Sequence, residues 1–150
     1  MPLLADEDVK YLKEQFAALE RDVTITVVTR ERSILLPGEE PAGDTSREVK
    51  MIAEELAATS PKLKLVAIDA ARDEERAREV AGERLPAIVF SSETSRGQLR
   101  YVGLPAGYEM SSVVATIGDL GGAAPVPEDV RARLAKLSKD VHIQVFVTPS

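Results

Sequence analysis

Residues 84–109 read RLPAIVFSSETSRGQLRYVGLPAGYE, and this stretch decides the fold. Pro86 cannot donate a hydrogen bond to a neighbouring strand, so it belongs at the start of a strand or at a bend before one. The apolar run 87–90 then fits a buried strand, and residues 98–102 fit its hairpin partner after a polar turn. Two glycines in the segment 103–109 allow a tight turn before a helix. The stretch therefore predicts the order strand, strand, helix.

The same stretch resembles the second half of a thioredoxin fold. The resemblance rests on the run LPAIVF and on a turn motif formed by Gly103, Leu104, Pro105, Ala106, Gly107, Tyr108 and Glu109. More narrowly, it resembles the N-terminal unit of the glutaredoxin-like protein disulfide oxidoreductases, which carry two thioredoxin-fold units in tandem. More distantly, it is similar to the N-terminal domain of the alkyl hydroperoxide reductase flavoprotein. The resemblance covers nearly the whole chain and implies an α/β fold, a central mixed sheet flanked by helices.

Composition limits the classes of function. A chain of 150 residues can form one domain with a core and an appendage, but it is too short for two complete domains. It contains no cysteine, which excludes thiol chemistry, disulfides and thiolate metal sites. The net charge of -6 argues against a nucleic-acid surface. Because the N-terminus lacks a signal-like pattern and no apolar run approaches about 20 residues, we expect a cytoplasmic chain without membrane contact. We also expect no cofactor and no metal.

Hydrophobic periodicity predicts the remaining elements. Apolar residues at helical spacing indicate an extra N-terminal helix over 6–20 that Asp6 can cap. Further helices are expected over 44–59 and 71–81, and strands over 23–29 and 63–69. The loop 30–43 carries Ile34, Leu35 and Leu36, which are expected to pack back onto the domain or to contact a partner. The two strands joined through a helix should be parallel.

The C-terminal part of the chain is predicted to be an appendage. Residues 1–120 form the domain, residues 121–127 are rich in Gly, Ala and Pro and form a linker, and residues 128–150 form a helix and a strand. In this last segment Val141, Ile143, Val145 and Val147 alternate with His142, Gln144 and Phe146. The resemblance implies that this strand opens a truncated second thioredoxin-like unit. Alone it would be an exposed edge, so we expect residues 141–147 to mediate a homodimer.

The resemblance also locates a former active site. In the family, the first turn of the helix predicted over 44–59 holds Cys-x-x-Cys, where the helix N-terminus lowers a thiol pKa. In this sequence the matching positions are Gly43, Asp44, Thr45 and Ser46. A hydroxyl nucleophile at Thr45 or Ser46 would need a nearby base, and the sole histidine, His142, lies on the terminal strand. Helix capping explains these residues better, and no catalytic residue is expected.

The Leu85–Pro86 pair and Asp69 each have a functional and a purely structural interpretation. The resemblance implies that the Leu85–Pro86 peptide bond is cis and that this pair borders a groove for an extended peptide. The structural interpretation is that the cis bond is only an inherited feature of the fold. The resemblance implies a buried proton relay as one role for Asp69, whereas its position at the end of a strand, in a chain without thiols, favours a turn cap. His142 has no cysteine or second histidine with which to hold a metal.

Three functions follow from these observations. The first is a redox-inactive unit of a glutaredoxin-like protein disulfide oxidoreductase, acting as a scaffold or docking module for a missing C-terminal unit or a redox partner protein. The second is a truncated product of a thiol-disulfide oxidoreductase gene whose catalytic cysteine or selenocysteine motif begins after Ser150. The third is a module that binds peptide or associates with itself.

Overall fold

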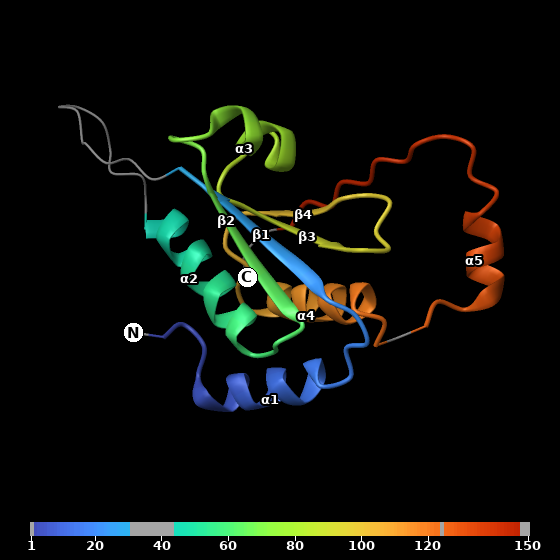
Figure 1. Ribbon diagram of the computed structural model, residues 1–150, viewed down its shortest axis with the longest axis horizontal. Helices are drawn as coiled ribbons and strands as arrows, with labels where there is room; N and C mark the ends of the chain where they lie inside the picture. Colours follow the sequence, from blue (N-terminus) through green and yellow to red (C-terminus); the bar gives the residue numbers. More distant parts are fainter. Residues whose placement is uncertain (1, 31–43, 124, 148–150) are drawn as a thin grey trace.

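The structure, a computed structural model, describes residues 2–30, 44–123 and 125–147. Its strands form one mixed sheet in the order β2-β1-β3-β4 (Figure 1). The strand bounds are Val23–Thr29 for β1, Leu63–Asp69 for β2, Ala87–Ser92 for β3 and Leu99–Val102 for β4. β1 is parallel to β2, and β3 is antiparallel to both β1 and β4. The four strands predicted between residues 23 and 102, the parallel pair and the hairpin are therefore confirmed. The apolar loop residues Ile34, Leu35 and Leu36 lie outside the described residues.

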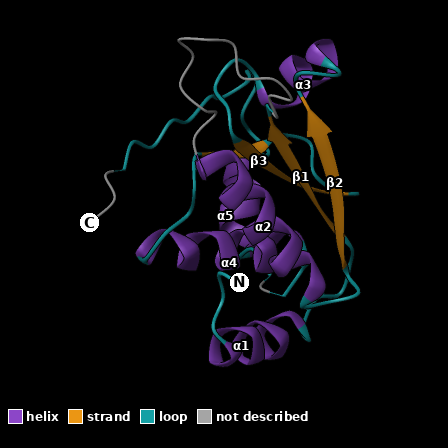
Figure 2. Cartoon of the chain, turned by 90° about the vertical axis from the view of Figure 1, so that its left-hand side faces the viewer, coloured by secondary structure: helices purple, strands orange, loops and turns teal. Residues whose placement is uncertain are grey.

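Helices cover the two faces of the sheet unequally. One face carries α1 (Asp6–Phe16), α2 (Asp44–Ala58) and α4 (Tyr108–Leu120), and α3 (Glu74–Ala81) is the only described helix on the other (Figure 2). α5 (Glu128–Leu134) is the last helix and lies apart from the sheet (Figure 1). No helix in the described ranges is both long enough and apolar enough to span a membrane.

The main core lies between the sheet and the three helices on its first face. It is built from buried side chains that recur at helical spacing in the helices and at alternate positions in the strands. They are Leu12, Phe16, Leu19, Val23, Ile25, Val27, Val49, Ile52, Ala53, Leu56, Leu63, Ile88, Phe90, Val113 and Ile117. Burial of this apolar surface is the main stabilising contribution to the fold.

The second face of the sheet is only half covered. Under α3, a smaller cluster packs Ala77 and Ala81 against Val28, Ile68 and Val89. Farther along the same face, the residues paired across β2, β1 and β3 are polar: Lys64, Thr24 and Ser91. Because these side chains tolerate water, half of this face needs no covering helix.

The N-terminus of α1 differs from the prediction. Asp6 is the first helical residue, and Ala5 occupies the cap position without a side-chain hydrogen bond. The expected cap by Asp6 was therefore wrong. The preceding segment is instead fixed from another element: the Glu55 carboxylate of α2 accepts hydrogen bonds from the backbone N–H of Leu3 at 2.7 Å and of Leu4 at 2.8 Å.

The end of α1 and the end of α4 meet at Gly121. α1 stops at Phe16, earlier than predicted, because the chain turns so that Leu19 is buried beside Gly121. The Gly121 carbonyl then accepts hydrogen bonds from the backbone N–H of Glu20 at 2.8 Å and of Arg21 at 3.1 Å. Gly121 is buried, so the start of the predicted linker belongs to the packed domain.

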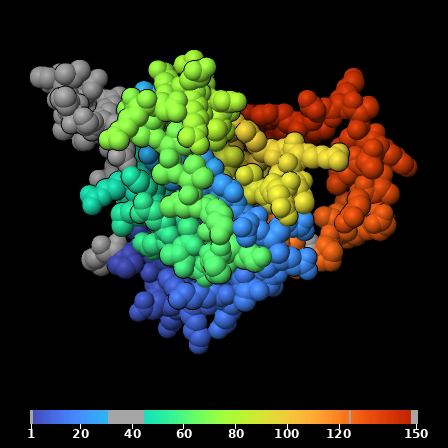
Figure 3. All heavy atoms as spheres, in the orientation of Figure 1, coloured from blue at the N-terminus to red at the C-terminus, as the bar shows by residue number. Residues whose placement is uncertain are grey.

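The chain from residue 125 to residue 147, here named the C-terminal arm, leaves the domain. α5 ends at Leu134, and residues 141–147 form no strand. Figure 3 shows the arm, in orange and red, beyond the β3–β4 hairpin. The strand predicted for 141–147 is absent because a strand needs neighbouring N–H and C=O groups, and none in the described part of the chain lies beside it. A short exposed helix such as α5 is marginal for a related reason, since no packing supports it.

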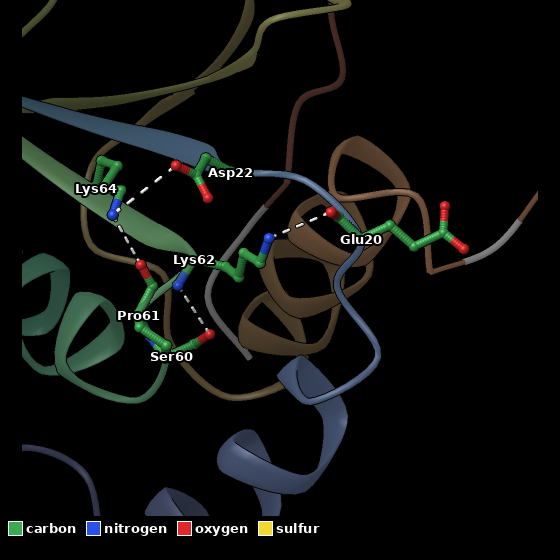
Figure 4. Close-up of polar contacts among 6 residues, drawn as sticks. All are labelled: Glu20, Asp22, Ser60, Pro61, Lys62 and Lys64. Atoms are coloured by element: carbon green, nitrogen blue, oxygen red, sulfur yellow. Dashed lines mark hydrogen bonds and ion pairs between the residues drawn. The ribbon is translucent and has the colours of Figure 1, made fainter.

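Polar contacts connect the residues at the end of the sheet where β1 and β2 begin (Figure 4). The Lys62 ammonium donates to the Glu20 carbonyl at 3.3 Å. The Lys64 ammonium donates to the Pro61 carbonyl at 2.9 Å and lies 3.8 Å from the Asp22 carboxylate. These contacts are exposed and contribute little stability, but they tie Lys64 to its own end of the sheet.

Candidate functional site

The candidate site lies at the end of the sheet where β1 finishes. The register places Val28 of β1 opposite Ala87 of β3, and Ala87 opposite Val102 of β4. Pro86 therefore stands beside the end of β4, and its carbonyl accepts a hydrogen bond from the Gly103 N–H at 2.9 Å. The Leu85–Pro86 peptide bond is cis, the geometry that the resemblance implies.

The N-terminus of α2 reaches the same end of the sheet. α2 connects two parallel strands, so it must run back from the end of β1 to the start of β2 (Figure 1). Its buried residues Val49, Ile52, Ala53 and Leu56 match the predicted face. Thr45 is exposed and Ser46 is half-buried in the first turn. α2 begins at Asp44, and Gly43 lies outside the described residues, as does the side chain of Asp44.

The turn between β4 and α4 is fixed by one polar pair. The Tyr101 hydroxyl donates a hydrogen bond to the Glu109 carboxylate, which also accepts from the Ala106 N–H at 3.4 Å. Burial raises the pKa of Tyr101 well above its usual value, and the hydrogen bond to Glu109 and its negative charge raise it further. Gly103 and Gly107 have φ of +98° and +54°, so both use the conformational freedom that the sequence suggested.

The rest of the turn motif divides between the core and the surface. Pro105 is buried and Leu104 packs against the main core, whereas the Tyr108 side chain is 88% exposed. Sequence reasoning identified Glu109 only as a motif residue and missed its pairing with Tyr101. A spacing of eight residues across a strand, a turn and a helix start has no periodic signal that would have revealed it.

The described residues of the site offer no nucleophile with a base. Thr45 and Ser46 carry hydroxyls, but His142 lies in the exposed C-terminal arm. Asp69 behaves as a turn cap: its carboxylate accepts from the Ala71 N–H at 2.9 Å and lies 3.5 Å from the Arg72 guanidinium. No group of three potential metal ligands comes together within the part of the chain that the structure describes.

Comparison with solved structures places this arrangement among known folds. The alkylhydroperoxide reductase AhpF from Enterococcus faecalis superposes with a TM-score of 0.70 at 21% identity, over 91% of this chain and 62% of that chain. A protein disulfide oxidoreductase from Aeropyrum pernix superposes with a TM-score of 0.69 at 19% identity, over 89% of this chain and 55% of that chain. The chain has a thioredoxin-like fold.

These neighbours are the two kinds of protein that the turn motif resembles. A separate structure of the NTD_N/C domain of the Enterococcus faecalis reductase gives a TM-score of 0.67 at 20% identity, over 91% of this chain and 62% of that chain. The thioredoxin-like chain thus spans less than two thirds of each neighbour. No protein-family model matches the sequence, and no curated protein matches it.

Proposed function

We propose that the chain is a redox-inactive thioredoxin-like unit that serves as a scaffold or docking module for a cytoplasmic partner carrying the reactive thiols. One observation carries the proposal. The first turn of α2, where the resembling oxidoreductases hold Cys-x-x-Cys, contains Asp44, Thr45 and Ser46, and the whole chain contains no cysteine. A chain without thiols cannot exchange disulfides, whereas its fold still offers the surface around that helix end.

The surface that remains for docking is centred on Leu85 and Pro86. Both residues are half-buried, and the Leu85 side chain packs against the cluster under α3. The backbone N–H and C=O of Leu85 have no hydrogen-bond partner among the described residues. An extended partner segment could satisfy these groups, as strand addition does elsewhere. The partner we propose is a second thioredoxin-like unit or another redox protein.

The proposal is tested by restoring the missing thiols. The wild-type chain should not reduce insulin disulfides in the presence of a thiol reductant beyond the rate of the reductant alone. The double variant Gly43→Cys with Ser46→Cys should reduce them, because the α2 N-terminus lowers the thiol pKa below the usual value of about 8.5. Turnover by wild-type chain would contradict the proposal.

A matched control separates position from the mere presence of thiols. Arg47→Cys with Lys50→Cys has the same spacing, but both residues lie deeper in α2. This control should show at most about a tenth of the rate of the first double variant, since the helix dipole acts mainly within the first turn. Equal rates from the two double variants would show that the helix terminus is not a preserved thiol site.

A further inference from the structure

The C-terminal arm exposes an unusual number of apolar side chains. Nine of them are between 37% and 81% exposed: Val126, Val130, Leu134, Leu137, Val141, Ile143, Val145, Phe146 and Val147. We propose that residues 141–147 of one chain add a parallel strand to the outer edge of β2 in a second copy of this chain. The proposal goes beyond docking at Leu85 and Pro86 and does not depend on it.

The arm needs an existing sheet rather than another free arm. Two isolated strands paired with each other are marginal in water, whereas a strand added to a formed sheet gains a ready row of backbone partners. Five of the nine exposed apolar side chains lie in the segment that pairs: Val141, Ile143, Val145, Phe146 and Val147. If two arms are exchanged, this apolar surface is buried twice in one assembly, together with the acceptor surface that each strand covers.

Of the two sheet edges, β2 matches the arm in length. β2 and β4 are the outer strands of the sheet, and no strand in the described ranges pairs with their outer edges. β2 extends over Leu63–Asp69, seven residues, and β4 over Leu99–Val102, four residues. The alternating segment 141–147 has the length of β2, so pairing there can extend along the whole segment.

The side-chain patterns of β2 and the arm also agree. Beside β2, the face under α2 carries Leu65, which is 37% exposed, and the opposite face carries Lys64. A strand with Val141, Ile143, Val145 and Val147 on one side would extend the apolar face past Leu65. On its other side, with residue 141 beside Leu63, His142 would stand beside Lys64 on the polar half of the second face, and Gln144 would stand beside Val66.

Phe146 decides the direction of the added strand. In parallel pairing, with residue 141 beside Leu63, Phe146 stands beside Ile68, next to the apolar cluster under α3. In antiparallel pairing, with residue 141 beside Asp69, Phe146 would stand beside Lys64 at the polar end of the same face. The parallel direction buries the aromatic ring against apolar neighbours, which is the more favourable environment.

The acceptor is a second copy because the arm of each chain lies on the opposite side of its own domain. α5 stands beyond the β3–β4 hairpin, whereas β2 is the far edge of the sheet (Figures 1 and 3). Two copies related by a two-fold axis can exchange arms, so that each β2 edge receives one strand and the assembly closes.

Sedimentation velocity on the full chain at micromolar concentration should show a dimer. Ile143→Asp should give a monomer, and His142→Asp, which stands beside Lys64 on the other side of the same strand, should leave the dimer intact. Leu65→Glu should also give a monomer, whereas Leu99→Glu is its matched control, since Leu99 lies on the same face at the opposite edge. A monomeric wild-type chain, or dissociation by the Leu99 variant alone, would overturn the proposal.

Cross-linking tests the register without relying on a disruptive charge. The chain has no cysteine, so introduced cysteines are its only thiols. A mixture of Leu65→Cys chains with Ile143→Cys chains should form a disulfide-linked dimer of the two variants on mild oxidation. A mixture of Leu99→Cys with Ile143→Cys should not. A cross-link to residue 99, or the absence of a cross-link between the Leu65→Cys and Ile143→Cys chains, would refute the exchange.

Discussion

The domain and the C-terminal arm are made from the same aliphatic residues, but only the domain buries them. Leu56 in α2 is fully buried, whereas Leu134 in α5 is 55% exposed. β1 and residues 141–147 are both seven residues long and rich in Val and Ile, but β1 has a strand on each side and the arm has none among the described residues. The comparison shows that an alternating apolar pattern gives a segment the capacity to form a strand, and that neighbouring strands decide whether one forms.

The sharpest test of this contrast replaces one leucine in each region. Leu56→Ala should lower the free energy of unfolding by about 2–5 kcal/mol, because it removes a fully buried side chain and leaves a cavity. Leu134→Ala should change it by less than about 0.5 kcal/mol, since water already reaches that side chain. Urea unfolding followed by circular dichroism measures both. Equal losses would show that α5 packs against the domain in solution.

The boundary between the two regions can be tested at Gly121. A Cβ at this position would lie 2.2 Å from Leu19 Cδ2 and 3.1 Å from the Ile117 carbonyl oxygen. Because Leu19 is buried and has little room to move, Gly121→Ala should cost about 1–3 kcal/mol.

Gly118 provides the control for this boundary test. A Cβ there would meet only Ala123 Cβ at 3.9 Å, so Gly118→Ala should stabilise α4 by roughly 0.5–1 kcal/mol. Thermal unfolding of the two variants should therefore shift in opposite directions. Tolerance of alanine at residue 121 would mean that the linker begins there, as the sequence alone suggests.

The smallest effect is expected at the polar pair inside the domain. Tyr101→Phe removes the hydrogen bond to Glu109 and should cost about 1 kcal/mol at neutral pH. The folded state raises the pKa of Tyr101, so the stability linked to this group is fully present below about pH 10 and is lost as pH rises toward the folded-state pKa. Above about pH 10, wild-type chain should therefore lose more stability than the Tyr101→Phe variant.

The control for this pH dependence is Tyr108→Phe, whose ring is 88% exposed. Chemical denaturation at a series of pH values should give the same slope for this variant as for wild-type chain. A Tyr101→Phe slope identical to wild type would show that the hydrogen bond to Glu109 does not link folding to pH.

The predictions that succeeded depend on local signals. Pro86 and the polar turn after residue 90 located the hairpin, and the spacing of Val49, Ile52 and Leu56 located the buried face of α2. Those that failed depend on contacts between distant segments. Asp6 looked like a cap, but the carboxylate of Glu55, about fifty residues away, fixes the chain before α1. Local spacing carries no information about such a partner.

The sequence by itself determined the order of elements from residue 6 to residue 120, the absence of cysteine and the position of the turn before α4, because each follows from residue type and short-range spacing. Only the tertiary structure decided that Gly121 belongs to the packed domain, that Tyr101 pairs with Glu109, and that residues 141–147 remain without a neighbouring strand in the described part of the chain. The physical reason is that burial and backbone pairing depend on which distant segments meet, and that choice is made when the core as a whole is packed.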